Sequence, residues 1–249
     1  MKIALTFDIE RDIPNVLDTY FGIKVGIPKI LELLENFNLK STFFCTGSIV
    51  KKFPDYIRLI EQKGHEIACH GLNHERLNNL SFNKCQELIS VNKKILESIC
   101  LSSKIIGFRA PYLKPPDFLF TILNNLGFKY DSSFKSNRKV DLNILNPYPI
   151  REFQPIDISL RMPSGYGILK RKLLKIEVVI LYFHPIEIVD AKKLMLTQKS
   201  RLNLFRNYFL RPDRWIKTGK TFVIRMNKLI KFALSQKVEF VTLKDLIND

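Results

Sequence analysis

Short apolar segments alternate with amphipathic stretches along the whole chain. Each apolar segment has the length of a buried strand, and polar residues follow directly after several of them. The stretches in between place apolar side chains three and four residues apart, a spacing that predicts helices. The predicted strands are residues 2–8, 41–45, 66–69, 105–108, 178–183 and 238–242, and the predicted helices lie at residues 28–37, 56–63, 81–99 and 222–233.

The order of these elements predicts the fold class. Strands that alternate with helices indicate a parallel sheet, and a chain of 249 residues has the length at which such a sheet commonly closes into a barrel. An open, doubly wound sheet is the alternative, but no G-x-G-x-x-G or P-loop sequence follows a predicted strand. Residues 132–175 are less regular and indicate long loops, and no linker separates a second domain. We therefore expect residues 1–249 to form a single α/β domain.

The composition is typical of a folded protein from a reducing compartment. Hydrophobic residues make up 46% of the chain and charged residues 26%, which is enough apolar side chain for a sizeable core. The four cysteines show no C-x-x-C spacing, so we expect reduced thiols. No apolar run is long enough for a signal peptide or a membrane span. These features predict a cytoplasmic protein.

Two of the four histidines, His70 and His74, follow a predicted strand and are separated by three residues. On one face of a helical turn, two imidazoles at this spacing can reach a single metal ion. Solvated or capping histidines are the alternative, and this short motif alone favours neither interpretation. A third ligand close by would favour the metal site.

Asp8 and Glu10, at the end of the first predicted strand, can supply that ligand. Alternation along a strand places both side chains on one side of the backbone and Ile9 on the other. One carboxylate could then bind metal while the other handles a proton. Acids at a strand end more often cap the next segment or stay solvated. Together with the two histidines, however, they complete a two-histidine, one-carboxylate set that leaves a position open for water.

Two further segments reach the same predicted edge of the sheet. In residues 106–112, Arg109 could orient a carboxylate, and backbone N–H groups after Pro111 could face a developing oxyanion. His184 directly follows the strand at 178–183 and is expected at the same rim. A structural ion pair for Arg109, simple packing for Tyr112 and a surface or core role for His184 are the alternatives.

With these motifs in this order, the sequence resembles the polysaccharide deacetylases of the NodB-homology type, a group of carbohydrate esterases. The resemblance covers most of the chain. It implies a distorted (β/α) TIM-like barrel of about seven strands and metal-dependent removal of N-linked acyl groups, usually acetyl, from amino sugars. The similar segments are Thr-Phe-Asp at 6–8, Ser-Thr-Phe-Phe at 41–44, Gly-His-Glu-Ile-Ala at 64–68, the H-x-x-x-H element, residues 107–112, Tyr-Asp-Ser-Ser at 130–133 and Tyr-Phe-His-Pro at 182–185.

The resemblance also implies a role for each candidate residue. Zn²⁺ is the default cation for such a ligand set, and Ni²⁺, Co²⁺ or Mn²⁺ would fit the same groups. His65 matches a structural position of the family. The implied site consists of His70 and His74 as metal ligands, Asp8 as catalytic base, Arg109 as the residue that orients this base, the backbone amide of Tyr112 as oxyanion donor and His184 as general acid.

The chain departs from the family at the third metal ligand. Members typically have two adjacent acids after Thr-Phe, but the second place is Ile9 here. We expect Glu10 to take over as the ligand, because its longer side chain can span the gap that one extra residue makes. Asp8 in that role, or Asp12 as a substitute, are lesser options.

Three other positions also differ from the family. The only tryptophan, Trp215, does not match the tryptophan-containing segment of the family. Tyr182 stands where members have a leucine, two residues before the catalytic histidine. For the acid that usually partners this histidine, Asp141 and Asp157 are the candidates.

The net charge of +16 indicates an anionic partner. Basic and apolar residues are interleaved between Lys199 and Lys220, so peripheral contact with an anionic membrane at the inner membrane face is one interpretation. A barrel helix with a solvated basic side is the stronger alternative. An amino-sugar glycan, or a sugar on a lipid or nucleotide carrier, would suit a cytoplasmic deacetylase. The chain has no helix-turn-helix, zinc-knuckle or RNP-type signature, so we expect no specific nucleic acid partner.

Two other functions remain open at this point. The chain could be a catalytically idle barrel that binds an anionic glycan or a lipid-linked sugar. It could also hydrolyse a formyl group or another amide at the same metal site. Metal analysis separates the idle barrel from the enzymes, and the released acid separates the enzymes from each other.

Overall fold

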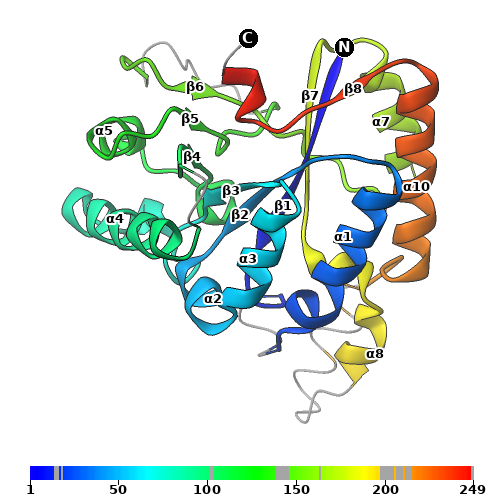
Figure 1. The fold of residues 1–249 in the computed structure, drawn as a ribbon, viewed down its shortest axis with the longest axis horizontal. Coiled ribbons are helices and arrows are strands. Elements are labelled where there is room, and N and C mark those ends of the chain that lie inside the picture. Colours follow the sequence, from blue (N-terminus) through cyan, green and yellow to red (C-terminus); the bar gives the residue numbers. More distant parts are fainter. Residues whose placement is uncertain are drawn as a thin grey trace.

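A computed structural model describes residues 1–13, 17, 19–100, 104–137, 146–162, 164–196, 205, 210 and 215–247. Its centre is a parallel sheet with the strand order β6-β5-β4-β3-β2-β1-β7, and β8 pairs with the first residues of β1 (Figure 1). A bridge between Pro155 and Ile180 joins the segment after β6 to β7, so the sheet curls round on itself. The strands are β1 (Lys2–Ile9), β2 (Thr42–Cys45), β3 (Glu66–Cys69), β4 (Gly107–Phe108), β5 (Tyr130–Asp131), β6 (Arg151–Glu152), β7 (Val178–Phe183) and β8 (Glu239–Phe240).

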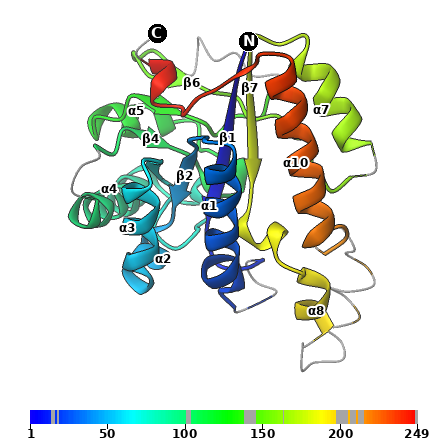
Figure 2. The same ribbon diagram turned by 45° about the vertical axis from the view of Figure 1, so that its right-hand side comes forward.

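Helices surround the curled sheet (Figures 1 and 2). Each contributes buried apolar side chains to the larger hydrophobic core. Within the described residues, no helix combines the length and the apolar character that a membrane span requires. The α-helices are α1 (Ile27–Asn36), α2 (Gly47–Lys52), α3 (Pro54–Gln62), α4 (Phe82–Ile99), α5 (Leu119–Asn125), α7 (Gly165–Leu173), α8 (Ala191–Leu196) and α10 (Lys220–Ser235), with short helical turns η1 (Gly22–Gly26), η2 (Leu77–Asn79), η3 (Pro111–Leu113), η4 (Pro185–Ile188) and η7 (Asp245–Ile247).

The strand register brings the carboxyl ends of the strands to one edge. Cys45 pairs with both Ile9 and Cys69, and Cys69 pairs in turn with Phe108. On the other side of β1, Phe7 pairs with Phe183. The residues that follow these strand ends therefore emerge side by side, as ligand-binding residues do in parallel α/β folds. This edge carries the candidate site.

The opposite end of the barrel interior is closed by side chains. Ala4, Phe44, Ala68, Tyr130 and Ile180 belong to a second, smaller buried cluster there. Small residues on β1 and β3 leave room for the aromatic rings of β2 and β5. The interior is therefore packed at the amino ends of the strands and polar at their carboxyl ends.

The sequence predicted the parallel, curled sheet correctly, together with the long helices α1, α3, α4 and α10. Gly64 ends α3 with φ +76°, and the Ser81 hydroxyl caps α4 by accepting from the backbone N–H of Lys84, as expected. The four cysteines are free and buried. Helices α2, α5 and α8 were not predicted, because their six or seven residues are too few to show a helical period. Helix α7 was not predicted either, because it lies in the irregular stretch 132–175, which was expected to form loops. That residues 1–249 form a single domain stays a prediction.

Candidate active site

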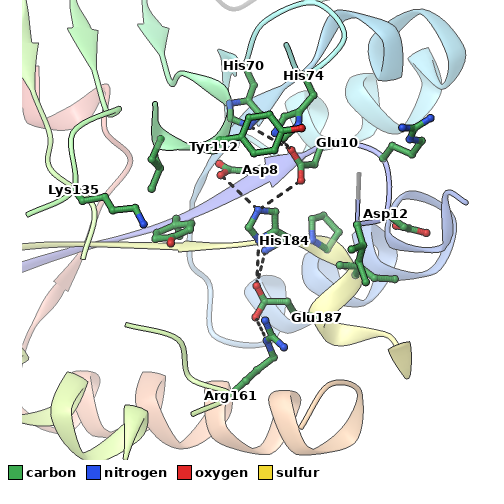
Figure 3. A pocket seen from close by; sticks show the side chains of 16 residues that line it. Asp8, Glu10, Asp12, His70, His74, Tyr112, Lys135, Arg161, His184 and Glu187 are labelled. Carbon is green, nitrogen blue, oxygen red and sulfur yellow. Dashed lines mark hydrogen bonds and ion pairs between the residues drawn. The ribbon is translucent and has the colours of Figure 1, made fainter. Parts of the chain in front are cut away.

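A cavity of about 330 Å³ opens at the carboxyl ends of the strands (Figure 3). Its walls come from β1, from the loop after β3, from η3 and from the turn after β7. Most of its polar groups are acids and histidines that point toward one another. The lining residues are Asp8, Glu10, Arg11, Asp12, Ile13, His70, His74, Tyr112, Leu113, Lys135, Arg161, Tyr182, His184, Pro185, Ile186 and Glu187.

Glu10, His70 and His74 form a cluster that could hold a metal ion. One ligand atom of each lies within 4.8 Å of the other two. Oε2 of Glu10 stands 3.6 Å from Nε2 of His70 and is also in contact with Nε2 of His74. Burial raises the pKa of Glu10, but the neighbouring imidazoles of His70 and His74 and the charge of His184 lower it below its usual range. Glu10 is therefore the carboxylate of the cluster.

The hydrogen bonds around this cluster favour a cation at its centre. Nδ1 of His70 lies 2.8 Å from the carbonyl oxygen of Arg109, so this nitrogen carries the proton and Nε2 presents a lone pair to Glu10. Within the described residues, neither Oε2 of Glu10 nor Nδ1 of His74 has a hydrogen-bond partner. A lone pair of Glu10 thus faces a lone pair of His70 in a buried place. A divalent cation is the group that fits between them.

The two histidines do not lie on a helical turn, so that prediction was wrong. His70 directly follows β3, and the chain then passes through Gly71 (φ +74°) to His74 (φ 62°). The carboxylate of Glu75 accepts hydrogen bonds from the backbone N–H groups of Leu72 and Asn73 and shapes this loop. The two imidazoles are therefore neighbours because the loop turns at residues with positive φ, and not because they share one face of a helix.

Asp8 is held by a buried arginine. Nη1 of Arg109 donates to Oδ1 of Asp8 over 2.7 Å and to the Thr6 hydroxyl over 2.8 Å. Nε and Nη2 of Arg109 donate to the carbonyl and hydroxyl oxygens of Ser132, so the guanidinium has one orientation. Burial raises the pKa of Asp8, but the Arg109 charge outweighs it and the pKa lies below its usual range. Asp8 is therefore ionised and free of the metal cluster, as a base requires.

His184 faces both acids from the other side of the cavity. Its Nε2 lies 3.7 Å from Oε1 of Glu10 and 4.0 Å from Oδ2 of Asp8. Burial lowers the pKa of His184, but the hydrogen bond to Glu187 and the charges of Glu10 and Asp8 raise it to about 9. The cavity thus contains an ionised carboxylate and a protonated imidazole, which is the pairing of a general base with a general acid.

The acid that partners His184 is Glu187, which the sequence patterns did not identify. Oε1 of Glu187 lies 3.3 Å from Nδ1 of His184 and accepts from its backbone N–H, while Oε2 accepts from Nε of Arg161. Of the two predicted candidates, Asp157 instead binds Lys135 and the Tyr182 hydroxyl. Asp141 lies outside the described residues. The spacing His-Pro-x-Glu, which places both side chains in one turn, could have identified Glu187.

Tyr112 and Asp12 complete the comparison with the predicted site. Tyr112 adopts φ 62° in η3, its ring lies 4.3 Å from that of His74, and among the described residues no hydrogen bond uses its backbone N–H. This amide is therefore available to an oxyanion.

Asp12 accepts hydrogen bonds from Thr19, Phe21 and Gly22, so its carboxylate serves to cap η1 and is not the third member of the cluster.

Comparison with known proteins relates this geometry to a family. The sequence pattern of the family described as polysaccharide deacetylase matches residues 1–130. A peptidoglycan deacetylase of Helicobacter pylori is 27% identical over 143 residues, which are 56% of this chain and 46% of that protein. The chain thus spans about half the length of this curated relative.

Solved structures show the same fold. A putative polysaccharide deacetylase from Mycobacterium smegmatis superposes with a TM-score of 0.63 at 21% identity, over 97% of this chain and 93% of that one. A pseudoenzyme of the CE4 family from Bacillus anthracis superposes with a TM-score of 0.62 at 14% identity, over 99% of this chain and 65% of that one. The fold is therefore shared with a pseudoenzyme, so function must be argued from the site.

Proposed function

The chain belongs to the polysaccharide deacetylase family, and we propose that it is a metal-dependent hydrolase that removes N-acetyl groups from an amino-sugar glycan. One observation carries the proposal. The Glu10, His70 and His74 cluster shares a single cavity with an ionised Asp8 and with His184. A catalytically idle barrel that only binds a glycan does not require metal ligands, a base and an acid in one cavity.

The metal ligands would be Glu10, His70 and His74. Two imidazoles and one carboxylate suit Zn²⁺, and Ni²⁺, Co²⁺ or Mn²⁺ are compatible with the same donors. Two observations support this assignment: Oε2 of Glu10 has no hydrogen-bond partner among the described residues, and Nδ1 of His70 donates to the carbonyl oxygen of Arg109. When bound, such a cation lowers the pKa of a coordinated water and polarises an amide carbonyl.

Two side chains beside the cluster carry out the two proton transfers of the reaction: one accepts a proton and the other donates one. Asp8, held by Arg109, accepts a proton from the attacking water. The Tyr112 backbone N–H donates to the oxygen that gains negative charge. The C–N bond then breaks, its electron pair remains on nitrogen, and the amine takes a proton from Nε2 of His184. The products are a carboxylate, acetate for an N-acetyl substrate, and a free amino sugar.

The glycan and its carrier belong to the same proposal. The name of the Helicobacter relative supports a glycan of the peptidoglycan type, and the net charge of +16 supports an anionic substrate such as a lipid-linked or nucleotide-linked sugar. We also infer a cytoplasmic location with peripheral contact to anionic membrane. Most of the basic segment between residues 199 and 220 lies outside the described residues. Vesicle sedimentation tests this contact, and equal binding to anionic and neutral lipids contradicts it.

Product analysis tests the reaction itself. The purified protein, loaded with Zn²⁺, is incubated with N-acetylglucosamine oligomers, N-acetylmuramic acid glycans and N-formyl analogues, and released acetate and formate are measured. We expect acetate release that stops on chelation and returns with added metal. Metal binding without release from any of these substrates would contradict the proposed reaction. Formate release alone would replace it by deformylation at the same site.

A further inference from the structure

Asn92 is a fully buried polar residue on the inner face of α4. Its Nδ2 lies 2.5 Å from the carbonyl oxygen of Gly71 and 3.1 Å from that of Cys45, and 3.0 Å from Sγ of Cys69. Cys45 and Cys69 are the last residues of β2 and β3, and Gly71 lies between the two histidines of the cluster. One side chain thus connects a helix to two strand ends and to the loop that carries the ligands.

The surroundings fix the orientation of this amide. Two carbonyl oxygens face the nitrogen, so a rotated amide would set oxygen against oxygen. Oδ1 lies against Gly47, where a Cβ atom would stand only 2.9 Å from it. Within the described residues Oδ1 has no hydrogen-bond partner. The amide therefore acts at this position through its donor group, and its buried oxygen carries a cost in free energy.

The hydrogen bond from Asn92 to the Gly71 carbonyl holds a loop whose backbone adopts an uncommon conformation. Gly71 and His74 both have positive φ, and for His74 this conformation is uncommon. The Gly71 carbonyl also accepts from the backbone N–H of Gly47, at the start of α2. The loop is therefore tied to α2 through the backbone and to α4 through Asn92. Replacing Asn92 would remove this hydrogen bond from α4 and leave the backbone bond from Gly47 in place.

We propose that Asn92 is a positioning residue of the metal site, which holds the loop at Gly71 so that His74 stays opposite Glu10 and His70. The inference rests on the proposed function, because it assumes that these three side chains bind a cation. Partners that orient ligating histidines typically change metal affinity 10–100-fold when they are removed. A residue that only packs would change stability and leave the affinity as it was.

The test compares two buried substitutions on α4. Asn92→Leu removes the donor and fills the same space with an apolar side chain. Ile89→Val is the control, because it trims a buried residue of the same helix that has no polar contact with the loop. Zn²⁺ dissociation constants are measured by competition with a chromogenic chelator, and the Co²⁺ absorption spectrum reports the coordination geometry. Thermal unfolding is recorded without metal.

We expect Asn92→Leu to weaken Zn²⁺ binding about 10–100-fold and to alter the Co²⁺ spectrum. We expect Ile89→Val to lower the unfolding temperature slightly and to leave both metal readouts unchanged. Wild-type affinity and spectrum in Asn92→Leu would overturn the inference, as would an equal loss of affinity in the control. If Asn92→Leu does not fold, Asn92→Ser is measured in the same way. Absence of Zn²⁺ binding by the wild type would instead contradict the proposed function.

Discussion

Two buried glutamates at opposite ends of the barrel interior have very different surroundings. Glu10, at the carboxyl ends of the strands, is 8% exposed, and its Oε2 faces imidazole nitrogens without a hydrogen-bond partner among the described residues. Glu66, at the amino ends, is 5% exposed. It accepts hydrogen bonds from the Thr42 hydroxyl, the Tyr130 hydroxyl and the backbone N–H of Lys244.

The difference shows that burial of a charge does not by itself indicate a functional site. Both carboxylates lost their water on folding, which costs free energy unless new partners replace it. For Glu66 the protein supplies those partners, and they fasten the C-terminal segment to β2, β3 and β5. For Glu10 the neighbours are imidazole nitrogens, and Oε2 has no hydrogen-bond partner among the described residues, an arrangement that suits a divalent cation. The proposed function therefore assigns binding and reaction to the end with the unsatisfied group, and the hydrogen bonds assign a stabilising role to the other end.

Asp8→Asn should have the largest effect at the reactive end. The amide keeps the shape and the contact with Arg109 but can no longer accept a proton from water, so we expect kcat for N-acetyl substrates to fall about 10²–10⁴-fold. Zn²⁺ content and the circular dichroism spectrum should match the wild type. Turnover within about threefold of the wild type would show that Asp8 is not the base.

Glu10→Gln should remove the response to metal. At a Zn²⁺ concentration 100 times the dissociation constant, binding stabilises the wild type by about 2.7 kcal/mol, which thermal unfolding detects as a higher midpoint. We expect no Zn²⁺-dependent shift in the variant, because the neutral amide is a poor ligand. A full shift in Glu10→Gln would assign the third ligand to Asp8 or to another group.

Glu187→Gln should lower the rate of amide hydrolysis about 10–100-fold, because it weakens the contact between Nδ1 of His184 and the side chain at position 187 that orients the ring. The aryl ester 4-nitrophenyl acetate provides a comparison, because its leaving group departs as an anion and needs no proton from His184. We expect its hydrolysis to change much less than that of the amide. Asp157→Asn is the control: Asp157 accepts from two residues that line the cavity, Lys135 and Tyr182, and among the described residues it makes no hydrogen bond or ion pair with His184, so the ratio of the two rates should stay unchanged. Parallel losses on both substrates would assign Glu187 a purely structural role.

Glu66→Leu should act on stability alone. The substitution leaves Thr42, Tyr130 and the Lys244 amide without their acceptor, and a buried unpaired donor costs about 1–3 kcal/mol. We expect a lower free energy of unfolding in urea and an unchanged Zn²⁺ dissociation constant. Weakened metal binding in this variant would remove the distinction between the two ends.

Glu152→Gln should have a smaller effect that depends on pH. Glu152 is half-buried beside Asp131, and its Oε2 is shielded from solvent. Desolvation and the charge of Asp131 raise the pKa of Glu152 well above its usual range, and burial raises the pKa of Asp131 to about 6. The folded chain therefore keeps a proton that the unfolded chain releases near pH 4, so wild-type stability decreases as pH rises from about 4 to 6 and above.

Glutamine resembles the protonated acid and has no proton to lose. The slope, at most about 1.4 kcal/mol per pH unit for one proton, should be flatter in Glu152→Gln than in the wild type. Urea unfolding at a series of pH values measures both slopes. Equal slopes would mean that the two acids do not share a proton in the folded state.

From the sequence we predicted the parallel sheet and the placement of most candidate site residues at one edge of it. Polar residues that directly follow apolar strands must emerge at one edge of a parallel sheet, so the order of the elements alone assigns Glu10, His70 and His184 to the same rim. Asp8 joined them through the two-residue alternation of β1. These predictions succeeded because they depend on local pattern and strand direction alone.

The tertiary structure decided what local pattern leaves open. Asp8, Glu10 and Asp12 are all acids near one strand end, but only packing against Arg109, the histidine loop and η1 gave each a different partner. A loop stands at Gly71 in place of the predicted helical turn, and its carbonyl accepts hydrogen bonds from the backbone of Gly47 and from Asn92, 21 residues away in sequence. Sequence sets which groups are available and which edge they reach. Contacts between distant segments set each group's orientation and charge, because both depend on the neighbours that folding supplies.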